Sequence, residues 1–222
     1  MAPLAIVDHP SPNFGPRRDG LTPQLVVLHY TDMASCTAAR DRLCDPEAEV
    51  SAHYLISYQG DIIRLVAEEA RAWHAGAGEW AGQTDINSRS IGIELDNAAG
   101  HPFSEPQMDA LERLLERLLS DHGIPPEGVI GHSCMAPGRK QDPGTRFDWA
   151  RLARRGLAAV LEQVPDPEVT EGAFTAAARA AGFTAEVPFE TLLRATRLRT
   201  APWRTGPLCA EDFTLPQHKR PL

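Results

Sequence analysis

Long apolar runs are missing from this 222-residue chain. No stretch approaches the roughly 18 consecutive apolar residues that a membrane-spanning helix requires, so the sequence does not predict a transmembrane segment. Excess positive charge is also missing, because 22 lysines and arginines face 30 aspartates and glutamates, for a formal net charge of −8. Nucleic-acid binding normally requires a basic face, so this balance argues against nucleic acid as a partner.

Cysteine is scarce, with four residues at positions 36, 44, 134 and 209. If Cys36 and Cys44 share a helix, the ~1.5 Å rise per residue separates them by about 12 Å. A disulfide tolerates only about 7 Å between Cα atoms, so we expect reduced thiols. The N-terminus also lacks the basic region of a signal peptide. Both features predict a cytoplasmic protein, with a periplasmic or cell-envelope location as the alternative if the true start lies upstream.

Apolar residues are nevertheless abundant enough for a core. Hydrophobic residues make up 42% of the chain and charged residues 23%, a balance typical of a globular protein. The length suits one domain of ordinary size with an appendage. We expect the main domain over residues 1–163, with a proline-rich arm over 1–24. The stretch from Val164 to Pro167 is typical of a linker, and a helical C-terminal segment is expected over 164–222.

Hydrophobic periodicity predicts both strands and helices in the main domain, so we expect an α/β fold. The clearest helix begins near Ser104, since Ser104 and Gln107 form a capping-box pattern and a stripe of leucines follows. Residues 53–66 are expected to form a hairpin around a turn at Gly60. Strands are expected at 25–30, 90–95 and 129–130, and helices at 37–43, 103–122, 149–163, 171–181 and 188–198.

Reactive side chains concentrate in the stretch GHSCMAPGRKQDPGTRFDW, residues 131–149. Its prolines and glycines exclude a regular helix or central strand, and a bent backbone would allow His132, Lys140 and Asp142 to converge. Imidazole and carboxylate are common zinc ligands, and a catalytic zinc site needs three protein ligands and an open position. His29 is the best remaining candidate, because it ends the apolar run LVVL, where open α/β sheets present site residues.

Five segments of the chain resemble, in order, the zinc-dependent N-acetylmuramoyl-L-alanine amidases related to peptidoglycan recognition proteins. They are LVVLHYT, SAHYLIS, AWHAG, SIGIELDN and the stretch just described. The resemblance covers roughly residues 10–160. It implies a central mixed β-sheet flanked by α-helices, and one Zn²⁺ per chain held by His29, His132 and Asp142.

The same resemblance implies that Glu94 and Lys140 are the catalytic pair. Some family members have cysteine in place of Asp142, and others have a catalytic tyrosine where this chain has Ala52. The role of general base would therefore fall to Glu94. From the residues alone, Glu94 is equally compatible with the solvated face of a half-buried strand. Lys140 supplies a fixed positive charge suited to a developing oxyanion.

Four further residues are candidates for substrate contacts: His53, Trp73, His74 and Arg139. Instead of contacting substrate, His53 could be a histidine packed within a strand, and Arg139 could simply face solvent. Trp73 and Trp80 flank a glycine-rich loop, and each offers either a flat face to a sugar or peptide or a core contact.

The resemblance implies hydrolysis of the amide bond between N-acetylmuramic acid and L-alanine, in peptidoglycan or its anhydromuropeptide fragments, during cell-wall turnover and recycling. Zinc would make its bound water acidic, and Glu94 would accept the proton. One alternative is a non-catalytic peptidoglycan-recognition module. Another is a closed zinc site with Cys134 as fourth ligand. The C-terminal segment faintly resembles a small peptidoglycan-binding domain, or else is a helical appendage, and the oligomeric state is not predicted.

Overall fold

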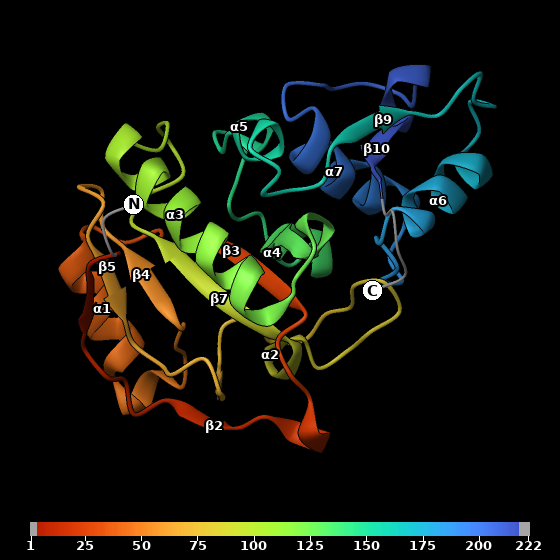
Figure 1. The fold of residues 1–222 in the computed structure, drawn as a ribbon. Coiled ribbons are helices and arrows are strands. Elements are labelled where there is room, and N and C mark those ends of the chain that lie inside the picture. The colour runs from red at the N-terminus through yellow and green to blue at the C-terminus, as the bar shows by residue number, and fades with distance from the viewer. Residues whose placement is uncertain (1–3, 218–222) are drawn as a thin grey trace.

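The structure is a computed structural model that describes residues 4–217. Its centre is a six-stranded sheet in the order β1-β5-β4-β7-β3-β8 (Figure 1). The strands are β1 (Ile6–Asp8), β3 (Leu25–Tyr30), β4 (Tyr54–Ile56), β5 (Ile62–Arg64), β7 (Ser90–Leu95) and β8 (Val129–Gly131). Strands β4, β7, β3 and β8 run parallel, whereas β5 pairs antiparallel with β4 and parallel with β1. The expected mixed α/β sheet and the 53–66 hairpin are confirmed.

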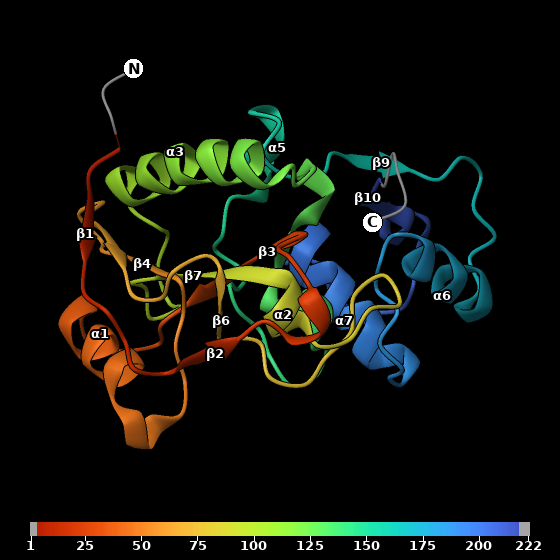
Figure 2. The ribbon, with the colours of Figure 1, turned by 60° about the horizontal axis from the view of Figure 1, so that its bottom comes forward.

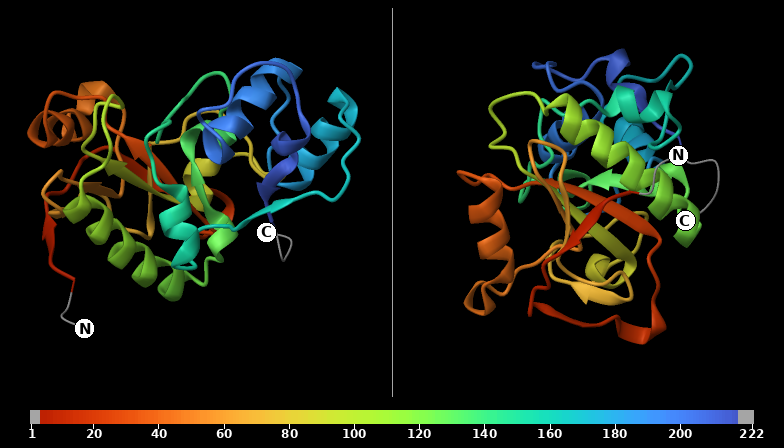
Figure 3. Two further views of the ribbon diagram at one scale, coloured as in Figure 1. Left: turned by 90° about the horizontal axis from the view of Figure 1, so that it is seen from above. Right: turned by 60° about the vertical axis from the view of Figure 1, so that its left-hand side comes forward.

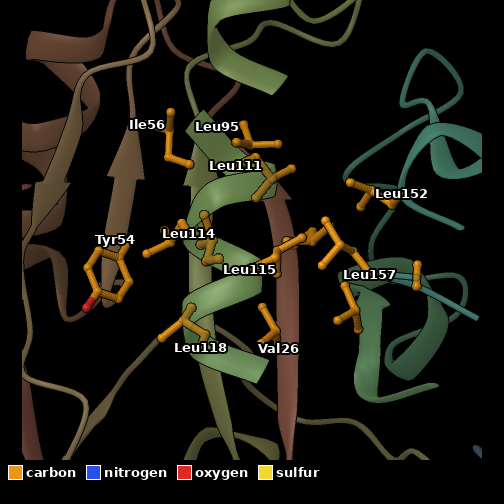
Figure 4. Packing of buried hydrophobic residues seen from close by; sticks show 14 of the residues in the cluster. Val26, Tyr54, Ile56, Leu95, Leu111, Leu114, Leu115, Leu118, Leu152 and Leu157 are labelled. Atoms are coloured by element: carbon orange, nitrogen blue, oxygen red, sulfur yellow. The ribbon is translucent and has the colours of Figure 1, made fainter. Parts of the chain in front are cut away.

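Helix α3 (Glu105–His122) covers one face of this sheet, with its leucine stripe turned inward (Figure 4). Ser104 caps the helix by accepting a hydrogen bond from the Gln107 backbone, at 3.3 Å, as the sequence predicts. The Gln107 side chain does not return to Ser104. It donates instead to the carbonyl oxygens of Ile56 and Asp96, and so ties the helix to two strands. Gly123, with φ of 64°, ends the helix in the left-handed conformation.

The opposite face of the sheet is covered by α2 (Ile86–Arg89) and α4 (His132–Met135). The C-terminal helices, α6 (Glu171–Ala180) and α7 (Phe189–Thr200), extend this layer, with α7 packing on α4 and α6 on α7 (Figure 2). Both helices lie within about two residues of the expected ranges. Side chains of α4, α6 and α7 share one apolar cluster with Val27 of the central sheet. The two views of Figure 3 show these C-terminal elements gathered at one end of the molecule.

The predicted helix over 149–163 is wrong in its second half. Helix α5 (Trp149–Arg154) stops at Gly156, whose φ of 69° suits a glycine that terminates a helix. The chain then extends as β9 (Leu161–Gln163), which pairs antiparallel with β10 (Thr214–Pro216). Its partner lies about fifty residues further along the chain, so local periodicity gave no sign of this strand.

The N-terminal arm is more regular than its prolines suggest. It contributes β1 to the edge of the central sheet, and β2 (Phe14–Pro16), which pairs with β6 (Ala70–Ala72).

Helix α1 (Cys36–Cys44) matches the expected helix, and the four cysteines are free thiols. Within residues 4–217 no helix combines the length and the apolar character needed to cross a bilayer. The remaining short 3₁₀ helices are η1 (Arg18–Gly20), η2 (Pro46–Ala48), η3 (Pro126–Gly128) and η4 (Ala210–Phe213).

Glu68 holds the start of β6 against α3 through a partly buried charge cluster. Arg117 and His122 of α3 lie 2.6 and 2.5 Å from its carboxylate, and the Tyr54 hydroxyl donates to it. Burial alone would raise the pKa of Glu68. The hydrogen bonds from Arg117, Tyr54 and His122 outweigh that effect and lower the pKa to about 2.

We therefore expect Glu68→Gln to reduce the free energy of unfolding by about 2–3 kcal/mol near neutral pH, because it removes a charged acceptor from two or more donors. A lowered folded pKa stabilises the fold above the unfolded value of about 4.3, and this stabilisation is lost as pH falls through about 2. Urea unfolding at a series of pH values should show the difference in free energy of unfolding between the parent and Glu68→Gln shrinking as the pH falls. Glu116→Gln breaks a more exposed ion pair, between α3 and Arg155, and should cost under about 1 kcal/mol. Equal losses for the two variants would contradict the prediction.

Candidate active site

Three buried residues converge where the parallel strands end. His29 is the penultimate residue of β3, His132 is the first residue of α4 directly after β8, and Asp142 lies in the proline- and glycine-rich loop that follows. The Oδ2 atom of Asp142 lies 2.8 Å from Nδ1 of His29 and 3.0 Å from Nδ1 of His132. One ligand atom from each residue fits within 4.8 Å of the others. The structure thus brings together the three residues expected to bind metal.

The donor set fits a cation. His132 Nε2 lies 2.9 Å from the carbonyl oxygen of Ala75, which can only accept, so Nε2 carries the proton and the lone pair is on Nδ1. That lone pair faces a carboxylate oxygen at 3.0 Å. Two acceptors at this distance repel each other unless a cation or a proton lies between them. The residues present therefore suit a metal such as Zn²⁺, which takes imidazole nitrogen and carboxylate oxygen.

The charges of the three residues agree with this arrangement. Burial alone would raise the pKa of Asp142, but contacts with His132 and His29 outweigh it and hold the pKa far below its usual value. Burial, reinforced by repulsion from His132, lowers the pKa of His29 to about 4. The group therefore offers an ionised carboxylate and a neutral imidazole from His29 near neutral pH, the states that ligate metal.

Glu94 lies beside His29 on the next strand, because β3 and β7 are paired in parallel with these two residues in register. Its Oε2 is buried and makes no hydrogen bond to any residue in the described part of the chain. Burial, together with the negative charge of Asp142, raises the pKa of Glu94 well above its ordinary value, although Lys140 opposes the shift. The residue as a whole is half-buried at the cleft, so Glu94 lies between the two alternatives of a core site and a fully solvated strand face. A buried carboxyl with a raised pKa beside a metal-ligand group is suited to accept and return a proton.

The alternation of β7 explains how one short strand serves both core and site. Ile91, Ile93 and Leu95 face the core under α3. Ser90, Gly92 and Glu94 face the opposite way, toward the metal-ligand group. Gly92 must be glycine, since a Cβ atom there would come within 2.4 Å of the His74 ring.

Lys140 and Arg139 follow α4 in the same loop as Asp142, and both are exposed residues at the cleft. Lys140 lines this cleft together with Glu94. Arg139 does not simply point into solvent. Its guanidinium donates to the carbonyl oxygens of Ala75, at 2.7 Å, and Ala77, so it fastens the loop that orients His132.

For three other residues the structure decides between the alternatives that the sequence left open. His53 is fully buried, with Nδ1 accepting from the Gly92 amide and Nε2 near the Ala70 carbonyl, so it is a packed strand histidine without access to substrate. Trp80 is also buried and packs edge-on against Phe183, with ring centroids 5.0 Å apart. Cys134 lies in the apolar core with Met135, outside the metal-ligand group, which removes the expected rival fourth ligand.

Trp73 and His74 do reach the site, where both are partly buried and line a cleft of about 450 Å³ over the metal-ligand group. His74 contacts His29 directly, with Nδ1 3.1 Å from Nε2. Sequence reasoning did not single out Tyr30, Met33 or Arg42, which also line the cleft. The one sequence signal that could have identified Tyr30 is its position directly after His29 at the end of β3.

Comparison with known proteins places this geometry in a family. The N-acetylmuramoyl-L-alanine amidase family, Amidase_2, matches residues 19–145. AmiD, an N-acetylmuramoyl-L-alanine amidase of Escherichia coli K12, is 39% identical over 154 residues, 61% of this chain and 54% of AmiD. The chain thus spans about half the length of that relative. The 1,6-anhydro-N-acetylmuramyl-L-alanine amidase AmpD of the same organism is 34% identical over 160 residues, 64% of this chain and 87% of AmpD.

Solved structures extend the likeness to the C-terminal helices. AmiD from E. coli, in complex with the substrate anhydro-N-acetylmuramic acid-L-Ala-D-γ-Glu-L-Lys, superposes with a TM-score of 0.76 at 28% identity, covering 88% of each chain. AmpDh3 from Pseudomonas aeruginosa, in complex with anhydromuramic pentapeptide, gives a TM-score of 0.78 at 30% identity and covers 93% of this chain and 92% of its own. By its matched domain, its fold and its relatives, this chain belongs to the N-acetylmuramoyl-L-alanine amidase family.

Proposed function

We propose that this chain hydrolyses the amide bond between the muramic acid lactyl group and L-alanine in anhydromuropeptides, using one zinc ion. The observation that carries the proposal is the convergence of two imidazole nitrogens and a carboxylate oxygen within 4.8 Å, beside the buried carboxyl of Glu94. Anhydromuropeptides are favoured as substrates because the solved structures of AmiD and AmpDh3 hold ligands of this class.

His29, His132 and Asp142 would hold the metal through Nδ1, Nδ1 and Oδ2. A zinc ion in such a site supplies a Lewis acid and lets water act as a nucleophile near neutral pH. Two imidazoles and one carboxylate leave an open position, as a catalytic site requires, and no further His, Cys, Asp or Glu within residues 4–217 completes the group.

The chain's own residues handle the proton and the charge. The ionised carboxylate of Glu94, made more basic by burial, takes the proton from the attacking water, and the protonated side chain then gives it to the leaving amine of L-alanine. Lys140 provides positive charge at the cleft where the carbonyl oxygen becomes negative. Trp73 and His74 form part of the wall against which the substrate would lie, and Arg139 keeps the loop behind them in place.

A non-catalytic recognition module of the same fold is the alternative. Such a module would have no use for a buried carboxyl with an unpartnered oxygen, which costs stability unless it serves a function. The complete ligand set and Glu94 together favour the enzyme.

We expect the purified protein to carry about one zinc per chain, to lose activity on exhaustive chelation, and to regain it with added Zn²⁺. Mass spectrometry of reactions with an anhydromuramyl-tripeptide should show free peptide beginning with L-alanine, and parallel reactions with polymeric sacculi should be slower. Full activity after removal of all metal would contradict the zinc proposal. Preferred release from sacculi would contradict the proposed substrate while leaving the reaction intact.

We further propose that residues 1–163 carry the catalysis and residues 164–222 support it. Helix α7 packs on α4, which begins with His132, and one apolar cluster spans both parts. The cytoplasmic location expected from the sequence stays a prediction, and cell fractionation would test it.

A further inference from the structure

A chain of hydrogen-bonded groups, called the file below, runs from His29 through His74 and Ser90 to the carbonyl group of Ile86. His29 Nε2 lies 3.1 Å from His74 Nδ1, and His74 Nε2 lies 3.2 Å from the Ser90 hydroxyl oxygen. The Ser90 hydroxyl lies in turn 2.6 Å from the carbonyl oxygen of Ile86. The file therefore connects the metal-ligand group to a backbone carbonyl of α2.

The direction of every proton in this file follows from its last member. A carbonyl oxygen can only accept, so the Ser90 hydroxyl donates its single proton to Ile86. Ser90 must then accept from Nε2–H of His74. A neutral His74 has no second proton, so its Nδ1 accepts from Nε2–H of His29, and the lone pair of His29 is left on Nδ1.

We propose that Ser90 and His74 are positioning residues that fix the tautomer and the ring orientation of His29, so that Nδ1 is presented to the metal. The inference rests on the zinc site of the proposed function and extends it to residues that touch neither metal nor the reacting atoms. Partners of this kind commonly set the orientation and basicity of metal-binding histidines.

The surroundings of His74 are shaped for this contact. Gly92 leaves room for the ring, which a Cβ atom would meet at 2.4 Å. The side-chain oxygen of Asn87 accepts from the backbone amides of His74 and Ala75, at 3.0 and 2.8 Å. Ala75 uses its own carbonyl to orient the other histidine ligand, His132. Two consecutive residues of one loop thus orient both imidazole ligands.

The first test compares zinc affinity among variants of His74, measured by competition with a chromophoric chelator. We expect His74→Leu to weaken zinc binding about 10- to 100-fold, the usual range for losing such a partner. His74→Asn places an amide oxygen where Nδ1 stood and should restore affinity to within about threefold of the parent, well under one decade. His122→Asn, which alters a histidine of α3 that contacts Glu68 and no member of the file, should leave zinc affinity unchanged.

The second test reads the tautomers directly by long-range proton–nitrogen correlation NMR of the zinc-loaded protein. The parent protein should show His29 and His74 protonated at Nε2. Ser90→Ala removes the acceptor for His74 and should shift the His74 ring toward a mixture of tautomers, with weaker zinc binding. Ser88→Ala removes an equally buried hydroxyl from the neighbouring helix and should change neither ring.

Two results would overturn the inference: parental zinc affinity in folded His74→Leu, or a parent His74 protonated at Nδ1 in the zinc-loaded protein. If His74→Leu does not fold, Ser90→Ala decides the matter, since unaltered tautomers and affinity would count against the file. Failure of the proposed function would look different, because the parent protein itself would then bind no zinc or release no peptide.

Discussion

Glu94→Gln should lower kcat by about 10²–10⁴ while zinc content stays at the parental level, since a general base contributes about this much to the rate. The amide keeps the shape of the side chain within β7 but cannot accept the proton of water. KM should change far less, because the lost interaction belongs mainly to the transition state. Single-turnover kinetics with an anhydromuropeptide and elemental analysis of the same preparation test both parts.

The same substitution should stabilise the zinc-free protein. Burial and the charge of Asp142 raise the folded pKa of Glu94, so the folded state holds this proton more tightly than the unfolded state. Parental stability should therefore fall as pH rises above the unfolded value of about 4.3, and Glu94→Gln should escape that loss. Near neutral pH the zinc-free Glu94→Gln variant should melt at a higher temperature than the zinc-free parent, and in acid the two melting temperatures should be equal. A zinc-loaded variant within about threefold of parental kcat, under one decade, would remove Glu94 from the reaction.

Asp142→Asn should abolish most zinc binding and, with it, activity. The carboxylate is the only negative group among the three ligands, and its Oδ2 lies between the two histidine nitrogens. Loss of a direct ligand should exceed the 10- to 100-fold effect of losing an outer partner, so we expect affinity to fall by more than about 100-fold. The zinc that the variant retains is measured by metal analysis after dialysis against a weak chelator.

Asp32→Asn is the matched control for this variant. Asp32 lines the same cleft but is exposed, and its φ of 49° is tolerated by asparagine. The control should retain parental zinc. Unchanged zinc in Asp142→Asn would mean that the third ligand has been misassigned.

The sequence predicted the elements that local signals specify. Helix α3 and the strands that carry His29 and Glu94 follow from periodicity, and the three residues proposed to bind metal follow from family segments around strand ends. The functions of Arg139 and His74 did not follow, because their partners lie on other elements. Arg139 reaches the carbonyls of Ala75 and Ala77, and a single sequence contains no record of such distant contacts.

The limit of local reasoning is clearest after α5. The run following Trp149 has helical character, yet Gly156 stops the helix and the chain leaves to pair with Thr214–Pro216. Trp80 and His53 show the same limit. From the sequence each could contact substrate or pack in the core, and only the tertiary structure, which buries both side chains, decides for the core.

The register of β3 and β7 also bears on how this protein tolerates change over evolution. His29 and Glu94 are neighbours in the backbone hydrogen-bond ladder, so their spacing is independent of the segments that join the two strands. Insertions in 31–53 or 96–104 could alter which substrates enter and leave the spacing intact. One residue inserted between Ser90 and Glu94 would turn Glu94 to the α3 face. We expect length variation among relatives to be common in those connections and absent within the five-residue span from Ser90 to Glu94.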